Sequence, residues 1–194
     1  MILRRMENSL RAAAALYPVV TLTGPRQSGK TTLAKAIFSD YAYANLEDPE
    51  LRALAHGDPK EFLRRFPEPV IVDEIQRVPD LLSTIQVLVD EQPDRKGRYV
   101  LTGSQQLNLR ASIAQSLAGR TAVLKLLPLS IGELMDAGFR LDRDVYLHNG
   151  FLPRRYQENI PSDSLYRNYF ETYVERDVRQ LIHVRNLHTF ELFI

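Results

Sequence analysis

The feature that most constrains this fold is the segment "GPRQSGKTT", which spans residues 24–32. Its first eight residues have the spacing G-x-x-x-x-G-K-T that is typical of a phosphate-binding loop. An apolar stretch containing Val19, Val20 and Leu22 precedes it, and "TTLAKAIF", with its apolar residues on one helical face, follows it. A chance match in a surface loop is the alternative, but the flanking strand and helix favour a true phosphate loop (residues 24–31).

The residues of the phosphate loop have separate predicted roles. Glycines at positions 24 and 29 let the backbone turn tightly and approach an anion, because they lack a Cβ atom. The following helix offers unpaired N–H groups and the positive end of its dipole. Lys30 is predicted to reach the β- and γ-phosphates, and the Thr31 hydroxyl to bind Mg²⁺. The predicted nucleotide-binding residues, with Arg26 expected to face solvent, are Gly24, Pro25, Arg26, Gln27, Ser28, Gly29, Lys30, Thr31 and Thr32.

Strand-like and helix-like segments alternate along the chain, as they do in proteins with a parallel sheet. The predicted strands lie in "PVVTLT", "YAYANL", "PVIVDE", "RYVLTGS" and "TAVLKLLPL". Helix starts are predicted where Asp48 and Asp58 each precede a proline, and where Ser130 forms a capping box with Glu133. We therefore predict an α/β fold of the P-loop class, with a five-stranded, mostly parallel sheet flanked by helices and followed in sequence by a helical segment. The ligand is expected at the carboxyl ends of the strands.

Two carboxylates end a strand that is otherwise apolar. "PVIVDE" places Asp73 and Glu74 at its carboxyl end, where burial is costly unless a cation neutralises them. Beside a phosphate loop the simplest cation is Mg²⁺, held by Asp73 through water. Glu74 is then predicted to act as the general base that polarises the attacking water. The alternative is an exposed acidic turn, since "DEIQ" can also begin a polar loop.

Three more polar residues join Lys30 and Glu74 as candidate catalytic groups. Thr102 and Ser104 end the fourth predicted strand, where either hydroxyl would sense the γ-phosphate or orient the water. The alternative there is a strand-to-helix turn with an N-cap serine. Arg120 precedes the fifth predicted strand and would stabilise charge on the transferring phosphoryl group, in its own subunit or a neighbouring one. A structural ion pair is the alternative for Arg120.

Composition excludes several classes of function. The 194 residues include no cysteine, so disulfides, thiolate metal sites and cysteine nucleophiles are excluded, and the four histidines form no metal-binding pattern. The net charge of +1 does not demand a nucleic-acid or membrane partner. The most apolar N-terminal segment, "AAAALYPVVTLTG", is too short to span a bilayer, and no secretory signal is evident. A cytoplasmic protein without a membrane partner is the expectation.

Together these segments resemble a family of AAA-like P-loop ATPases of bacteria and archaea that carry a C-terminal domain of unknown function. The resemblance rests on "LTGPRQSGKTTL", "YANLEDPE", "PVIVDEIQRVPDLL", "YVLTGSQQL", "SLAGRTAVLKLLPLSIGEL", "GFLPRRY" and "YFETYVERDV". It implies ATP rather than GTP, a sensor strand between the phosphate-loop strand and the Asp-Glu strand, and a family role for Arg120. Relatives tend to have paired glycines where this chain has Gly150 and Phe151, which puts the turn there in doubt.

Several functions are compatible with these features. The favoured one is Mg²⁺-dependent ATP binding and hydrolysis that switches or moves an attached module. The alternatives are an ATP-binding regulatory module with little turnover, including one associated with DNA, and a small-molecule kinase. A GTPase is disfavoured because the chain has no N-K-x-D segment. Residues 140–185 contain eight Arg or Lys and seven Asp or Glu, which gives no basic stripe, so a nucleic-acid partner is left open.

The domain boundary is predicted near Gly138. Residues 1–137 would form the ATPase core, and residues 138–194 the helical start of a truncated C-terminal domain. "SDSLYRNYFETYVERDVRQLI" predicts one long helix capped by Ser162 or Asp163, with an apolar and aromatic face. The chain then ends in the apolar run "LHTFELFI", without a C-cap glycine. We expect this segment to transmit the change between nucleotide states to a C-terminal domain or protein partner. If Arg120 acts on a neighbouring subunit, the protein is expected to form a homo-oligomer.

Overall fold

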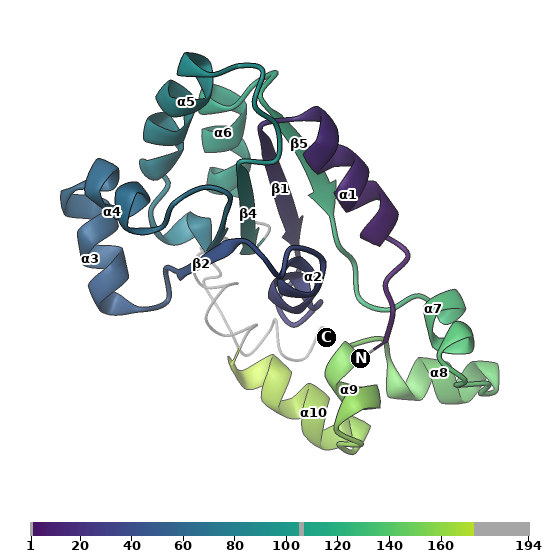
Figure 1. Cartoon of the computed structure of the whole chain (residues 1–194). Coiled ribbons are helices and arrows are strands. Elements are labelled where there is room, and N and C mark those ends of the chain that lie inside the picture. Colours follow the sequence, from purple (N-terminus) through teal and green to yellow (C-terminus); the bar gives the residue numbers. More distant parts are fainter. Residues whose placement is uncertain (1, 105–106, 173–194) are drawn as a thin grey trace.

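The computed structural model describes residues 2–104 and 107–172. Its centre is one parallel sheet of five strands in the order β2-β3-β4-β1-β5 (Figure 1). The strands are β1 (Val19–Gly24), β2 (Ala42–Asn45), β3 (Val70–Asp73), β4 (Tyr99–Ser104) and β5 (Thr121–Lys125). The predicted five-stranded sheet is confirmed, and β4 lies between the phosphate-loop strand β1 and the Asp-Glu strand β3, as the family resemblance implies.

Helices cover both faces of the sheet. Alternate residues of one strand enter separate cores: Val70 and Val72 pack on one side, whereas Ile71 packs on the other. The side of Ile71 is covered by α1 (Glu7–Leu16) and α2 (Lys30–Ile37). The opposite side is covered by α3 (Pro49–Gly57), α4 (Pro59–Arg65), η1 (Ile75–Arg77), α5 (Leu81–Glu91) and α6 (Leu107–Ser116).

The predicted helix starts are confirmed at atomic detail. The Asp48 carboxylate accepts hydrogen bonds from two backbone N–H groups of α3, and Asp58 accepts one from α4. Ser130 and Glu133 form a reciprocal capping box at α7 (Ile131–Asp136). These caps satisfy donors that the first helical turn leaves unpaired. No helix in the described part of the chain is long and apolar enough to cross a membrane.

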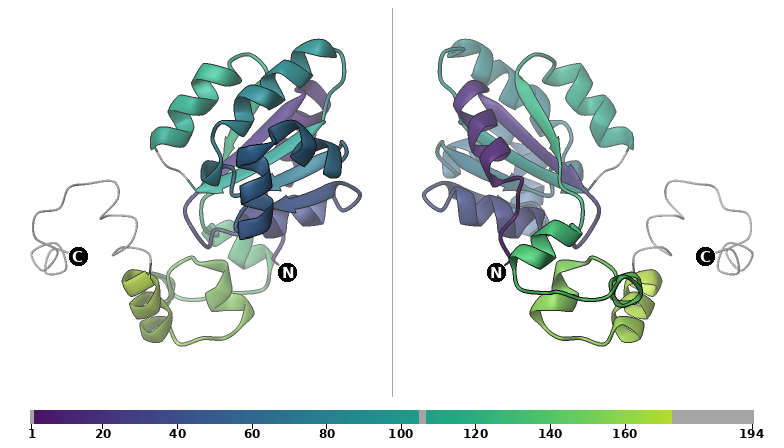
Figure 2. Two further views of the ribbon diagram at one scale, coloured as in Figure 1. Left: turned by 90° about the vertical axis from the view of Figure 1, so that its left-hand side faces the viewer. Right: turned by 90° about the vertical axis from the view of Figure 1, so that its right-hand side faces the viewer.

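Short helices gather beyond the carboxyl ends of the strands (Figures 1 and 2). After α7 they are α8 (Arg143–Asn149), α9 (Pro153–Gln157) and α10 (Ser162–Tyr169). A small core joins α7, α8 and α9 to Ile2 near the N-terminus, and it includes Leu134 of α7, Tyr146 of α8 and the partly buried Tyr156 of α9. The helical segment therefore packs on residues from both ends of the predicted ATPase core.

The predicted cap of the last helix is wrong. Pro161 occupies the N-cap position, and no side chain caps α10. Ser162 lies inside the helix, where its hydroxyl donates to Asn149 Oδ1 (3.0 Å) and accepts from Arg155 Nε (2.9 Å). A buried hydroxyl group needs such partners, and these ones tie α10 to α8 and α9. The predicted continuation of the helix and the run "LHTFELFI" lie outside the described residues.

Candidate active site

The phosphate loop requires glycine at both of its predicted positions. A Cβ atom on Gly24 would stand 2.1 Å from the carbonyl oxygen of Leu126, so any side chain there would displace the backbone. Gly29 has φ +91° and forms the N-cap of α2, a conformation that other residues rarely adopt. The chain can therefore leave β1, turn, and enter α2 at Lys30, with the N-terminus of that helix facing the loop.

Lys30 is a buried cation at the centre of the loop. Its side chain belongs to a residue only 5% exposed, and Nζ donates to the carbonyl oxygens of Gly24 (3.2 Å) and Pro25 (2.8 Å). Burial lowers the pKa of Lys30, while the nearby Glu74 and Asp73 carboxylates act in the opposite direction. An ammonium group whose hydrogen-bond partners are neutral carbonyls is suited to an incoming anion.

Asp73 is held by three hydroxyl groups from three different elements. Thr31 Oγ1 of α2 lies 3.0 Å from both carboxylate oxygens, and Tyr43 of β2 donates from 2.9 Å. Thr102 of β4 donates to Oδ1. Because Asp73 is only 4% exposed, these bonds compensate for its burial and fix the orientation of the carboxylate.

The Thr31–Asp73 pair fits a magnesium ion. Hydroxyl and carboxylate oxygens are ligands that Mg²⁺ prefers, and it keeps several waters and phosphate oxygens as its other ligands. No group of three or more His, Cys, Asp or Glu side chains able to hold a metal occurs in the described ranges. A cation at Thr31 and Asp73 would therefore depend on phosphate and water to complete its shell.

Glu74 follows Asp73 in a left-handed conformation (φ 59°) that turns it out of the strand line. The Gln76 side-chain amide donates to Glu74 Oε2. Glu74 shares a cavity of about 510 Å³ with the phosphate-loop residues Arg26, Gln27, Gly29, Lys30 and Thr31 and the adjoining Thr32. The structure thus brings the predicted base beside the predicted phosphate site.

The far wall of this cavity comes from the helical segment. The lining residues there are Pro153, Arg154, Gln157 and Glu158, followed by Tyr169 and Thr172. Arg154 Nε donates to Glu158 Oε2 at 2.8 Å, and both side chains are about half exposed (53% and 51%). Residues from outside the predicted ATPase core therefore lie where a nucleotide would bind.

Two predicted residues carry buried hydroxyl groups without a hydrogen-bond partner. Among residues 2–104 and 107–172, Ser28 Oγ, Ser104 Oγ and Gln76 Oε1 are the buried side-chain atoms in this state. Ser104 pairs with Gly24 in the register of β4 and β1, so its hydroxyl belongs to the edge of the sheet that bears the phosphate loop. An unsatisfied buried hydroxyl group is costly, and a ligand oxygen bound beside it would remove that cost, which fits the sensing role predicted for Ser104.

Arg120 lies at the amino-terminal ends of the strands, whereas the phosphate loop lies at their carboxyl ends. Its carbonyl oxygen accepts from the N–H of Val19, at the start of β1, whereas Gly24 ends that strand roughly 16 Å away. Its guanidinium group forms two bonds with Asp90 of α5, at 2.5 and 2.7 Å. This placement contradicts action on the nucleotide of the same subunit, while action on a neighbour stays a prediction.

The expectation that Arg26 faces solvent is also wrong. Arg26 is half-buried and lines the same cavity as Lys30 and Glu74. Its position follows from the turn of the phosphate loop, in which Gln27 rather than Arg26 is the exposed residue. The structure therefore places a second cationic side chain of the loop beside the predicted phosphate site.

Among the residues of this region that were not predicted from the sequence, three have contacts that bear on the site. They are Tyr43, which binds Asp73, Arg154, which lines the cavity, and Arg4, which donates to the carbonyl oxygen of Ser28 at 2.7 Å. Tyr43 alternates with apolar residues in a predicted strand, so its hydroxyl was a detectable signal. Arg4 and Arg154 lie far from the loop in sequence, and although Arg154 belongs to the block "GFLPRRY", nothing in that block relates it to the phosphate site.

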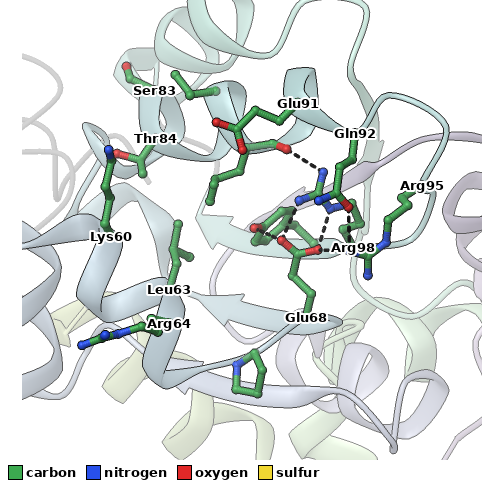
Figure 3. Close-up of a pocket in the computed structure, with 14 residues that line it drawn as sticks. Lys60, Leu63, Arg64, Glu68, Ser83, Thr84, Glu91, Gln92, Arg95 and Arg98 are labelled. Carbon is green, nitrogen blue, oxygen red and sulfur yellow. Dashed lines mark hydrogen bonds and ion pairs between the residues drawn. The ribbon is translucent and has the colours of Figure 1, made fainter.

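A larger cavity of about 850 Å³ lies between α4 and α5 at the amino-terminal edge of the sheet (Figure 3). It contains none of the predicted site residues. Its floor is a polar network in which Arg98 binds both oxygens of Glu68, at 2.5 and 2.8 Å, and donates to the carbonyl oxygen of Leu88 at 2.7 Å. Tyr99 also donates to Glu68. These bonds join the starts of β3 and β4 to the end of α5.

Replacing Glu68 with Gln should destabilise the fold at neutral pH by about 1–3 kcal/mol, because Arg98 loses its carboxylate partner. Burial raises the pKa of Glu68, but the bonds from Arg98 and Tyr99 outweigh it and hold the pKa below 4.5. The stabilisation is thus complete above the unfolded pKa and disappears as pH falls through the folded pKa. Urea unfolding at pH 7 and below pH 4.5 should show the difference between parent and variant shrinking with acid.

The exposed Glu91, which lines the same cavity, is the matched control for Glu68. Glu91→Gln should change the free energy of unfolding by less than about 0.5 kcal/mol at either pH. A Glu68 variant as stable as the parent at pH 7 would contradict a stabilising role for the network.

Comparison with known proteins identifies two segments. A family model described as an AAA domain matches residues 16–135, and one described as a domain of unknown function matches residues 140–194. Two uncharacterized proteins, from Mycobacterium bovis and Mycobacterium tuberculosis, are each 32% identical over 185 residues, covering 93% of this chain and 41% of the relative. The chain thus spans about two fifths of the length of these curated relatives.

Solved structures with a similar fold include nucleotide-binding proteins. A Walker-type ATPase of Pyrococcus abyssi has a TM-score of 0.57 and 15% identity, covering 97% of this chain and 77% of its own. AMPPCP-bound DnaA from Aquifex aeolicus has a TM-score of 0.50 and 15% identity, covering 89% and 63%. At this level of identity the likeness concerns the fold.

Proposed function

We propose, since the chain belongs to the AAA domain family, that it binds ATP with Mg²⁺ and hydrolyses it to ADP and phosphate. The observation that carries the proposal is the grouping of a buried Lys30, the Thr31–Asp73 pair and Glu74 around one cavity. Each has the chemistry that phosphoryl transfer to water requires, and neither cysteine nor a cluster of metal-binding side chains in the described residues suggests another reaction.

Each residue has a distinct part in the proposed reaction. Lys30 moves its ammonium group from the loop carbonyls to the β- and γ-phosphates. Thr31 and Asp73 would hold Mg²⁺, and a bound ion would supply charge neutralisation at the phosphates. Glu74 accepts a proton from the water that attacks the γ-phosphorus, and the bond to the leaving ADP oxygen breaks. Thr102 keeps Asp73 oriented, and the Ser104 hydroxyl senses the γ-phosphate.

The proposal includes coupling between the nucleotide and the helical segment. Its support is that residues of the helical segment, among them Arg154 and Glu158, line the same cavity as Lys30. A bound triphosphate would attract Arg154 and repel Glu158, so the half-exposed ion pair between them would open as the nucleotide charge increases. Movement of α9 would then carry the nucleotide state towards a C-terminal domain or protein partner.

Replacing Lys30 with Ala should abolish tight ATP binding and lower hydrolysis by roughly 10²–10³-fold, equal to about 2.7–4 kcal/mol of transition-state stabilisation. The loop would lose the cation that faces the phosphates while keeping its glycine turns. Calorimetry with ATP, ADP and GTP, together with phosphate release, measures both effects. Amide hydrogen exchange should also slow in α9 when ATP binds to the parent, and should not respond in the variant.

The exposed Lys60, on the rim of the other cavity, provides a control of equal charge. Lys60→Ala should bind and hydrolyse ATP like the parent. A folded Lys30 variant with the parent's affinity and rate would refute the proposed site. Binding of ATP without any change in the exchange of α9 would refute the coupling and leave the ATPase proposal standing.

A further inference from the structure

Arg4 is a buried arginine that links three parts of the chain behind the phosphate loop. Its side chain is 9% exposed. Nη1 donates to the carbonyl oxygen of Ser28 at 2.7 Å, and Nε donates to Glu133 Oε1 at 3.0 Å. Nη2 donates to the carbonyl oxygens of Leu127 (2.6 Å) and Pro128 (3.3 Å). One guanidinium group therefore joins the phosphate loop, the segment that follows β5, and α7.

The contact with Ser28 fixes one peptide unit of the loop. In a trans peptide the C=O and N–H bonds point in opposite directions. Because Arg4 draws the Ser28 carbonyl to itself, the N–H of Gly29 points away from Arg4. Gly29 and Lys30 line the cavity that also contains Glu74. Backbone N–H groups at this point of a phosphate loop bind anions only when they are all turned towards the ligand.

Glu133 holds Arg4 in turn. The Glu133 side chain is 7% exposed and accepts from the backbone N–H groups of Arg5 (2.9 Å) and Ser130 (2.8 Å) as well as from Arg4. Its carboxylate therefore belongs both to the capping box of α7 and to the ion pair with Arg4. The orientation of the Ser28–Gly29 peptide depends on the position of α7, the first helix beyond the sheet.

We propose that Arg4 is a positioning residue for nucleotide binding, which orients the phosphate loop from behind and is itself held by Glu133 of α7. This rests on the proposed function of the loop. The anion that benefits is the β-phosphate of a nucleoside diphosphate or triphosphate, since the Gly29 N–H lies at the start of α2. The affinities for ATP and for ADP should therefore depend on Arg4 to the same degree.

The test compares Arg4→Met with the adjacent Arg5→Met in the 194-residue chain. Arg5 is the matched control because its side chain is 65% exposed and pairs with Asp136 at the surface. Calorimetry with Mg-ATP and Mg-ADP should show Kd for both nucleotides raised about tenfold in Arg4→Met, equal to 1.4 kcal/mol. KM for ATP should rise similarly while kcat at saturating ATP stays close to the parent value. Arg5→Met should leave Kd unchanged.

Two milder variants separate positioning from folding. Arg4→Lys keeps the charge but cannot reach the loop and Glu133 together, so its Kd should lie between those of parent and Arg4→Met. Glu133→Gln preserves a capping box, which glutamine also forms, and should raise Kd through the loss of the Arg4 partner. If Arg4→Met does not fold, the Kd values of these two variants test the positioning role of Arg4.

Each outcome has one meaning. A parent chain that binds neither nucleotide refutes the proposed function, independently of Arg4. A parent that binds ATP, together with an Arg4 variant of lower Tm but unchanged Kd, overturns the positioning role in favour of a structural one. Equal losses in the Arg4 and Arg5 variants would also overturn it, because they would reflect net charge rather than the contact with Ser28.

Discussion

Replacing Glu74 with Gln should leave ATP binding intact and lower hydrolysis by roughly 10²–10⁴-fold, the range that a general base contributes. The amide has the size of the carboxylate but cannot accept a proton from water. Lys30, Thr31 and Asp73 make their contacts without Glu74, so phosphate and metal binding should survive. Calorimetry with Mg-ATP and single-turnover phosphate release measure the two effects separately.

The bond from Gln76 to Glu74 offers a check on the Glu74 prediction. Gln76→Ala removes a donor from the carboxylate but leaves the base in place, so hydrolysis should fall far less than in Glu74→Gln. Glu91→Gln, at an exposed position, controls for charge. Equal losses of binding and hydrolysis in a folded Glu74 variant would assign Glu74 to metal binding or structure and reject it as the base.

Local signals predicted the fold well because each acts over a few residues. Alternating apolar residues and the helix caps at Asp48, Asp58 and Ser130 depend on neighbours in sequence, and the structure confirms these caps. The resemblance to AAA-like ATPases added the strand order, which no local pattern contains. The sheet confirms the order, and the family match confirms the resemblance. Helix α1, rich in alanine, was not predicted, and neither was the cap at Pro161.

The candidate site was predictable only where its residues are close in sequence or end neighbouring strands. Thr31 and Asp73 meet because parallel strands bring their carboxyl ends together. Arg4 reaches the loop through packing of the N-terminus on α7, and Arg154 through packing of the helical segment. Such contacts depend on tertiary structure. For Arg120 the sequence left an ion pair and a role in catalysis open, and the structure supplies the partner, Asp90.

Replacing Arg120 with Ala should lower ATP hydrolysis by roughly 10³–10⁵-fold if this arginine acts on the γ-phosphate of a neighbouring subunit. Within its own subunit it lies at the amino-terminal ends of the strands, away from the phosphate loop, and is bound to Asp90. A role in trans therefore requires an oligomer in which this end of the sheet faces the cavity of the next copy. Specific activity of the parent should then rise with protein concentration, measured as phosphate release at saturating Mg-ATP.

Asp90→Asn separates a catalytic Arg120 from a structural one. If the ion pair only stabilises the fold, breaking it from either side should have the same effect, so both variants should lose stability and activity alike. If Arg120 acts in trans, Asp90→Asn keeps the guanidinium group and should retain most of the hydrolysis.

Mixing the Lys30→Ala and Arg120→Ala proteins tests directly whether the site is shared between subunits. Lys30→Ala subunits still carry Arg120, and Arg120→Ala subunits still carry the phosphate loop. Two inactive variants that regain activity on mixing require a site shared between subunits, whereas a mixture as inactive as its parts would remove Arg120 from the reaction.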